Sequence, residues 1–267
     1  MENKRKTSNP APPTGGLQGA STPPGGGVRG AIMTKTPIDI TPFLRALLRL
    51  EGGLQLSENK SLMETFESSR ERMYSDDPDD RGGATLCGVT LPTLNDWAHR
   101  TLGPSTTFTE EDLQNLSFHN WLEVVKTLFW KELRCDEYYG RPHLALAVAD
   151  FAFNSGVRRA AKYLQSGLNE LNEFSHSFET KRKDEDGVTR PVLIHIDEDG
   201  IVGRQTLTAI QKVLRHVNVE EQAVHLICER RRAFINSRVE RGIIKAKFHR
   251  GLLKRVDYIE GMQRWEL

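Results

Sequence analysis

The fold is decided by the stretch PHLALAVADFAFNSGVRRAAKYLQSGLNEL, residues 142–171, which is the most apolar helical region of the chain. Leu144, Val148 and Phe151 recur at helical spacing and predict a buried helical face. The triplet NSG at 154–156 predicts a break in the helix, after which the helical pattern resumes. The stretch therefore predicts two consecutive helices.

Helical patterns also fill most of the chain on either side of this stretch. Apolar residues recur at helical spacing in seven further segments: 41–51, 57–73, 90–103, 109–133, 203–217, 220–240 and 246–262. Only two short β elements are expected, one at 84–90 and one surface hairpin within 173–196. The fold class that follows is mainly α.

Composition and charge narrow the class of protein. The 267 residues are 37% apolar and 27% charged, with a formal net charge of +1, which suits a soluble globular protein and gives no sign of a nucleic-acid partner. Residues 229–267 carry eleven basic and five acidic side chains, for which a solvated helix face is the leading interpretation and contact with an anionic polymer the alternative. Apolar runs stay below the roughly 18–20 residues that span a bilayer, so no membrane insertion is expected.

The N-terminus and the cysteines indicate the cellular compartment in which the chain folds. Residues 1–36 are rich in Pro, Gly, Ser and Thr, which predicts a disordered tail without the apolar core of a secretory signal peptide. Cys87, Cys135 and Cys228 are widely spaced and match no zinc pattern. We expect three buried thiols in a chain that folds in a reducing compartment.

Glu51 is the first candidate for chemistry. It ends the apolar helical segment 41–51 and is followed at once by Gly52 and Gly53. Helix-end carbonyls and apolar neighbours both disfavour a charged carboxylate, and a carboxyl group that keeps its proton is what a general acid requires. The glycines are predicted to leave room for a substrate, although a solvated acid beside a glycine cap is the simpler alternative.

A second acidic segment follows at 74–90, with the sequence YSDDPDDRGGATLCGVT. A carboxylate close to a hydroxyl is the usual equipment for activating water at a sugar carbon, and this segment offers several aspartates before Thr85. A solvated acidic turn is the alternative. The spacing of the glycines does not fit a calcium-binding loop.

Taken together, these segments resemble glycoside hydrolase family 108, the lysozyme-like N-acetylmuramidases. EGG at 51–53 and the loop at 74–90 resemble the family's E-G-G-Y and N-D-P-x-D-P-G-G-A-T-x-x-G-I-T, and residues 144–165 resemble its apolar helix with D-x-x-x-N-S-G. DEDGIVGRQTLTAI, residues 197–210, resembles the family's D-G-x-x-G-x-x-T-L segment, which is assigned to a peptidoglycan-binding part. The similarity runs in order over residues 40–260.

The resemblance implies roles for individual residues. Glu51 is implied to be the catalytic acid that protonates the leaving glycosidic oxygen. Asp80 and Thr85 are implied to hold a water or to stabilise the oxocarbenium-like charge, and Asp77 competes with Asp80 for this role. No metal and no organic cofactor is implied.

Contacts with the sugar are expected from aromatic residues and from an asparagine. Tyr74 is a candidate for stacking on a sugar ring, as are Trp97 and Trp130, although large aromatic residues more often belong to the core. Asn154 is a candidate for a hydrogen bond to an N-acetyl group, and an ordinary helix break is the alternative for this residue.

The chain departs from the family pattern at two insertions, about residues 54–73 and 172–194. The first separates Glu51 from the acidic loop and must fold outward for the two to meet; Arg81 also replaces a family proline. The implied architecture is a lysozyme-like helical catalytic domain at 37–168 with a small β-hairpin, followed by a C-terminal peptidoglycan-binding helical region at 169–267.

The implied function is hydrolysis of peptidoglycan glycan strands in the periplasm or cell wall, after export without a signal peptide. Two routes stay open: a phage endolysin released through a holin, and a toxin delivered by a contact-dependent machine such as a type VI secretion system. A toxin would imply an immunity protein as partner. The alternative function is a non-catalytic module that binds peptidoglycan.

Overall fold

The computed structural model describes residues 36–76, 83–215 and 217–262. The segment expected to form the N-terminal tail lies outside the described residues up to position 35, and so do Asp77 and Asp80.

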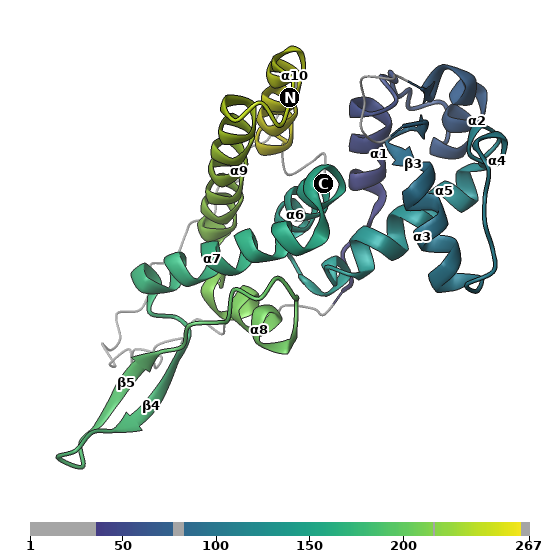
Figure 1. The fold of residues 1–267 in the computed structure, drawn as a ribbon. Coiled ribbons are helices and arrows are strands. Elements are labelled where there is room, and N and C mark those ends of the chain that lie inside the picture. The colour runs from purple at the N-terminus through teal and green to yellow at the C-terminus, as the bar shows by residue number, and fades with distance from the viewer. Residues whose placement is uncertain (1–35, 77–82, 216, 263–267) are drawn as a thin grey trace, which may run out of the picture. The chain divides into compact units, whose positions relative to one another are not determined.

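The fold is mainly α, as predicted (Figure 1). Its α-helices are α1 (Thr41–Leu50), α2 (Leu62–Met73), α3 (Leu91–Thr101), α4 (Glu110–Gln114), α5 (Phe118–Val125), α6 (Pro142–Ser155), α7 (Val157–Ser175), α8 (Arg204–Val213), α9 (Val217–Glu240) and α10 (Ala246–Glu260). A π-helical turn, η1 (Lys126–Lys131), continues α5, and a 3₁₀ turn, η2 (Cys135–Glu137), precedes α6. In Figure 1, α1 to α5 gather on one side of α6, and α7 to α10 lie on the other.

Two of the helices begin later or are capped differently than the sequence indicated. Ile40 rather than Thr41 is the N-cap residue of α1, and Asp39 accepts the Thr41 backbone N–H at 3.0 Å. The helix expected at 57–73 starts only at Leu62, because Ser61 and Glu64 form a reciprocal capping box that sets its first turn.

The predicted β element at 84–90 is present and contains one strand more than expected. Strands β1 (Tyr74–Ser75), β2 (Thr85–Leu86) and β3 (Val89–Thr90) form an antiparallel sheet in that order. The turn between β2 and β3 consists of Cys87 and Gly88, whose φ angles of 46° and 76° give the left-handed backbone that suits a tight two-residue hairpin.

Helix α6 is the central element, and its burial follows from its sequence. It contacts α1, α7, α9 and α10, and ten consecutive residues from His143 to Ala152 are buried. Ser155 ends α6, and Gly156, with φ of 94°, turns the chain into α7, so the break predicted at NSG is confirmed. The predicted domain boundary after residue 168 falls inside α7.

The surface hairpin predicted within 173–196 is also present. Strands β4 (Glu179–Lys183) and β5 (Thr189–Leu193) pair antiparallel, and Figure 1 shows them projecting away from the helices. The three cysteines are buried free thiols, as expected. No helix in the described part of the chain is long and apolar enough to cross a membrane.

Candidate active site

Glu51 caps the C-terminus of α1 and lies against a guanidinium group from the other end of the chain. Its backbone N–H donates to the Leu47 carbonyl, and its side chain is 21% exposed. Arg255 of α10 donates from Nη1 to Glu51 Oε1 at 2.5 Å. Asn154 of α6 donates from Nδ2 to the same oxygen at 3.2 Å.

These three residues belong to a closed ring of five side chains. Asp150 lies one turn before Asn154 on α6, so both face the same direction. Asp150 accepts hydrogen bonds from Arg255 Nη2 and Arg231 Nη1, each at 2.6 Å. Arg231 of α9 then reaches Asn154 Oδ1 from Nη2 at 3.4 Å, which closes the ring. Helices α6, α9 and α10 together therefore fix the end of α1.

Three of the five side chains of the ring are buried, while Glu51 is half-buried and Asn154 is exposed. Asp150, Arg231 and Arg255 are 0%, 2% and 7% exposed. Burial alone would raise the pKa of Asp150, but the charges of Arg255 and Arg231 outweigh it and hold that pKa below its ordinary value. Burial likewise opposes the charge of Arg255, yet Asp150 and Glu51 raise its pKa above the usual range. The ring thus brings the carboxyl groups of Glu51 and Asp150 against two guanidinium groups.

The ring gives Glu51 a charged neighbour that the sequence did not reveal. The reasoning from the helix end considered backbone carbonyls and apolar neighbours, whereas the nearest charged group to Glu51 is the buried Arg255. Arg255 lies 204 positions away in the chain, so local sequence could not show the contact.

The β2–β3 turn covers the other side of Glu51. A Cβ atom at Gly88 would lie 2.9 Å from both Cγ and Cδ of Glu51 and 2.5 Å from a ring carbon of Phe153. The turn backbone therefore approaches the carboxyl group as closely as only glycine allows. The first insertion leaves this approach intact: the chain forms α2 and returns through β1 to pair with β2.

The two glycines after Glu51 differ in the space beside them: no atom lies within 4 Å of an added Cβ at Gly53, whereas Gly52 is closely packed. A Cβ at Gly52 would meet the Leu48 carbonyl at 2.7 Å and Met73 Sδ at 2.8 Å, so protein atoms rather than an open space lie beside it. Gly53 has φ of 60° and ends the helix through its left-handed backbone. The expectation that Gly52 leaves room for substrate is therefore wrong.

The remaining predicted site residues are placed as follows. Thr85 lies on β2 opposite Ser75 and donates from its hydroxyl to the Ser75 carbonyl at 3.3 Å. Among the described residues it makes no hydrogen bond to Glu51. Tyr74 is half-buried on β1, where burial and the negative charges of Asp76 and Glu110 raise its pKa. Asp77 and Asp80 lie outside the described residues.

The other aromatic candidates belong to the core. Trp97 is 6% exposed and Trp130 4%. Trp130 stacks on Phe43 with ring centroids 5.8 Å apart. Core packing, the alternative considered for them, is therefore what the structure has.

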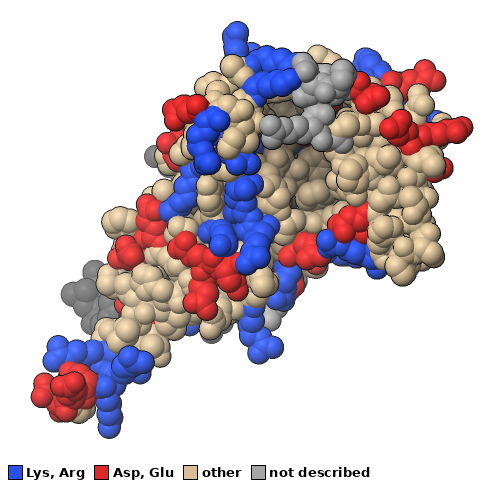
Figure 2. Space-filling model, viewed as in Figure 1, with Lys and Arg blue, Asp and Glu red and all other residues tan. Residues whose placement is uncertain are grey.

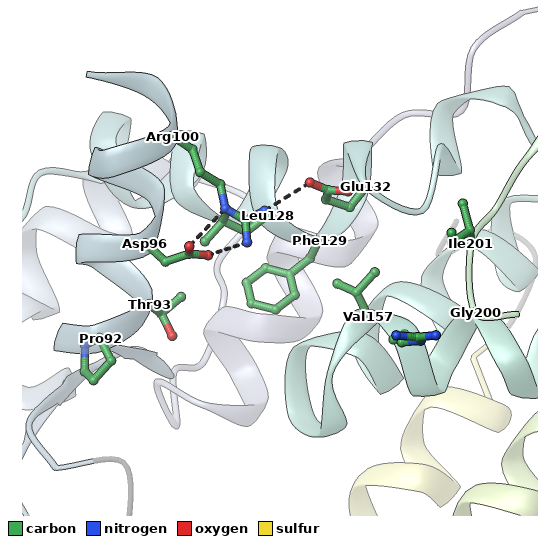
Figure 3. A pocket seen from close by; sticks show the side chains of 11 residues that line it. Pro92, Thr93, Asp96, Arg100, Leu128, Phe129, Glu132, Val157, Gly200 and Ile201 are labelled. Atoms are coloured by element: carbon green, nitrogen blue, oxygen red, sulfur yellow. Dashed lines mark hydrogen bonds and ion pairs between the residues drawn. The ribbon is translucent and has the colours of Figure 1, made fainter. Parts of the chain in front are cut away.

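A pocket of about 590 Å³ opens near the α6–α7 junction (Figure 3). Thr93, Phe129 and Val157 line it, and Arg100 forms ion pairs with Asp96 and Glu132 across its rim. The Phe129 ring lies 4.9 Å from that of Phe153, the residue that also touches the turn beside Glu51. The pocket and Glu51 are thus separated by two aromatic rings. In the described part of the chain, no group of three or more His, Cys, Asp and Glu side chains could hold a metal.

Sequence reasoning missed Asp150, Arg231, Arg255 and Gly88 as parts of the site. One signal was present: Asp150 is the only charged residue in the apolar run LALAVADFAF, and a charge at a buried position requires a partner. The identity of that partner was not readable, because Arg231 and Arg255 each lie among several other basic residues in helical segments.

Comparisons with known proteins agree with the resemblance seen in the sequence. Residues 66–156 match the family model described as Glycosyl hydrolase 108, and residues 190–257 match the one described as Predicted Peptidoglycan domain. Glu51 precedes the first matched segment, while Asp150 and Asn154 lie inside it and Arg231 and Arg255 lie inside the second. The resemblance to this hydrolase family with a peptidoglycan-binding region is confirmed.

The solved structure of Brucella abortus SagA is similar in fold. It is 23% identical to this chain with a TM-score of 0.50, and the similarity covers 70% of this chain and 83% of that one. At this identity the likeness concerns the fold alone. No curated protein matches the chain.

Proposed function

We propose that this glycoside hydrolase, which acts on cell-wall peptidoglycan, is an N-acetylmuramidase. It cleaves the β-1,4 bond between N-acetylmuramic acid and N-acetylglucosamine, with Glu51 as the general acid. The observation that carries the proposal is the hydrogen bonding of the Glu51 carboxyl group, because its two oxygens have different surroundings.

The surroundings of the two oxygens indicate where the proton sits. Among the described residues, both hydrogen bonds to Glu51 end on Oε1, from Arg255 and Asn154. An oxygen that accepts from two donors has no lone pair directed at a proton of its own. The proton for the leaving glycosidic oxygen is therefore carried by Oε2. When it departs, Arg255 compensates the negative charge left on the carboxylate.

A second group must handle water or the positive charge that develops on the sugar. Thr85 suits the first task, because its hydroxyl donates to the Ser75 carbonyl and keeps its lone pairs free to accept from water. Asp80, with Asp77 as its competitor, stays the proposed carboxylate partner. Both lie in the segment that leads into β2, the strand whose turn touches Glu51.

The decisive experiment is Glu51→Gln, which keeps the size of the side chain but removes the proton that is transferred. We expect kcat on purified peptidoglycan to fall about 100- to 10,000-fold, as for loss of a general acid, while the protein still sediments with peptidoglycan. Glu58→Gln, an exposed carboxylate in the insertion after Glu51, is the control and should keep full activity.

The products define which bond is cut. Borohydride reduction of the released fragments should label muramic acid as the new reducing end. Labelled glucosamine would overturn the proposed bond. If the wild-type protein sediments with peptidoglycan but releases no reducing ends, the alternative of a non-catalytic binding module holds.

For its biological setting we propose an antibacterial cell-wall-degrading role, either as an endolysin or as an effector toxin exported by a type VI secretion system. An effector would have an immunity protein as partner. Co-purification of the chain with the product of a neighbouring gene that blocks its activity would support the effector, and a neighbouring holin gene would support the endolysin.

A further inference from the structure

A second pocket borders the ring of Glu51 and has a strongly basic lining. It has a volume of about 360 Å³ and is bordered by Asn154 and Arg231 of the ring and by Arg159 and Arg238. Its remaining walls are mostly apolar and include Ile235 and Leu252, and its described lining contains no Asp or Glu. Figure 2 shows Lys and Arg side chains gathered on this face, over α7 and α9.

Two of the three guanidinium groups in this pocket, those of Arg159 and Arg238, differ from their neighbours because they have no carboxylate partner among the described residues. On α9, Arg230 pairs with Glu170 at 2.5 Å and Arg232 with Asp257 at 2.7 Å. Among the described residues, Arg159 and Arg238 form no ion pair. Both instead lie over the ring of Phe234, at 4.4 and 5.4 Å from its centroid, which holds them in place.

Arg231 adds a buried donor with no partner. Its Nη1 is taken by Asp150, and its Nε has no hydrogen-bond partner although the side chain is only 2% exposed. A buried donor without a partner costs free energy unless a ligand or water satisfies it. Arg231 therefore adds to the lining a guanidinium group whose charge Asp150 already pairs and whose buried Nε is unsatisfied among the described residues.

We propose that this pocket binds the stem peptide attached to the muramic acid beside the scissile bond, with Arg238 and Arg159 holding a peptide carboxylate. The inference rests on the proposed function and names the part of the substrate that it recognises. The first stem-peptide residues combine small alkyl groups with carboxylates, and the pocket combines apolar walls with guanidinium donors, which bind carboxylates in bidentate geometry.

The position of the pocket agrees with this assignment. Asn154 contributes to its wall and also donates to Glu51. A peptide in the pocket would therefore leave its sugar next to the acid. Because binding energy at a distance from the reacting bond can position the substrate, the pocket would favour strands that carry peptides over bare glycan.

The test compares two soluble substrates: uncrosslinked glycan strands with their peptides, and the same strands after an amidase has removed the peptides. We expect the wild-type protein to have the lower KM on peptide-bearing strands. Arg238→Gln should raise KM on these strands about 5- to 10-fold, the loss of one charged hydrogen-bonded pair, and leave KM on bare strands unchanged. Arg238→Lys should restore part of the difference.

One control variant and the comparison of the two substrates separate the inference from the proposed function. Arg241→Gln alters an exposed arginine just beyond α9 and should change neither KM. If the wild-type protein cleaves both substrates with equal KM, or if Arg238→Gln weakens both equally, the inference fails while the proposed function stands. If the wild-type protein cleaves neither, the proposed function fails and the inference with it.

Discussion

Gly88 shows at the scale of a single residue how tightly the site is built. Its backbone is left-handed, with φ of 76°, and it lies against both Glu51 and Phe153. The sequence showed a glycine in a hairpin but not this approach, because the contact depends on how the hairpin docks on the end of α1. Local sequence determines a turn, whereas docking depends on the whole core.

We expect Gly88→Ala to damage activity more than stability alone explains. The added Cβ would overlap Phe153 and Glu51, which should cost about 1–3 kcal/mol of unfolding free energy and displace the carboxyl group. Because a displacement of about 1 Å can cost on the order of 100-fold in rate, kcat should fall by about 10- to 100-fold. Urea unfolding and release of reducing ends measure the two effects.

Gly242→Ala is the matched control for this prediction. Gly242 also has a left-handed backbone, with φ of 65°, but no atom lies within 4 Å of the position of an added Cβ. Gly242→Ala should lose about 1–2 kcal/mol of unfolding free energy, because alanine disfavours a left-handed backbone, and should keep its kcat. Equal kcat values for the two variants would contradict the role given to Gly88.

At the scale of elements, the sequence predicted which helices and strands exist better than it predicted where they begin and end. The α6–α7 break at NSG followed from apolar periodicity and a glycine, and the structure has it. Strand β1 was missed because Tyr74 and Ser75 carry no alternating pattern over two residues and pair only when β2 folds back. The π-helical turn η1 was missed because it continues an ordinary helical pattern.

The β4–β5 hairpin is predicted to be dispensable for folding and for cleavage of soluble glycan. Its strand residues are exposed except for half-buried Glu179 and Leu193, and its base is closed by a 2.8 Å hydrogen bond from Ile194 N–H to the Phe178 carbonyl. Asn172 fixes the same base by accepting the Phe178 N–H at 2.8 Å. Excision should therefore leave the base in place.

The variant replaces residues 179–193 by Asn-Gly, a pair that suits a two-residue hairpin turn. We expect the free energy of unfolding to change by less than about 1 kcal/mol, measured by thermal unfolding. We also expect kcat on soluble strands to stay the same. A control that replaces only residues 184–188 by Asn-Gly keeps both strands. A loss of kcat in the longer excision but not in the control would place the strands in the substrate site instead.

At the scale of the molecule, the site joins segments that the sequence assigned to separate regions. Glu51, the proposed general acid, precedes the first family match, while Arg231 and Arg255 lie in the segment that matches the predicted peptidoglycan domain. The sequence predicted Glu51 from a helix end and a resemblance, but it did not show that Arg255 contacts Glu51 or that Arg231 contacts Asp150 and Asn154. Arg255 lies 105 positions from Asp150 and Arg231 lies 81 positions from it, so these pairings depend on helix packing, which periodicity does not encode.

We therefore predict that the first region alone is inactive. A chain of residues 37–168 retains Glu51, Asp150 and Asn154 but lacks both arginines, so Asp150 would be left as a buried charge without a partner. It should release no reducing ends even from soluble strands. Arg255→Gln in the full chain separates the two causes: a kcat decrease with retained sedimentation on peptidoglycan would assign the loss to the ring rather than to binding.

Asp150 connects α6 to both α9 and α10 through Arg231 and Arg255. Asp150→Asn keeps the size of the side chain but leaves two buried guanidinium groups without their carboxylate, which should cost about 3–5 kcal/mol of unfolding free energy at pH 7. Arg255 and Arg231 would also lose the contact that directs them toward Glu51 and Asn154, so kcat should fall even where the variant is fully folded.

The stability lost in Asp150→Asn should depend on pH. The pKa of Asp150 lies below its ordinary value of 3.8 in the folded protein, so the unfolded chain takes up the proton first as the pH falls. The stabilisation is therefore complete well above pH 3.8 and declines below it. Urea unfolding of both proteins should show a constant difference between about pH 5 and 8 that narrows below the ordinary pKa. Asp112→Asn, at an exposed helix cap, should show a much smaller difference throughout. A difference that stays constant into strong acid would mean that Asp150 does not stabilise the fold as a charge, and the ring would then be held by packing.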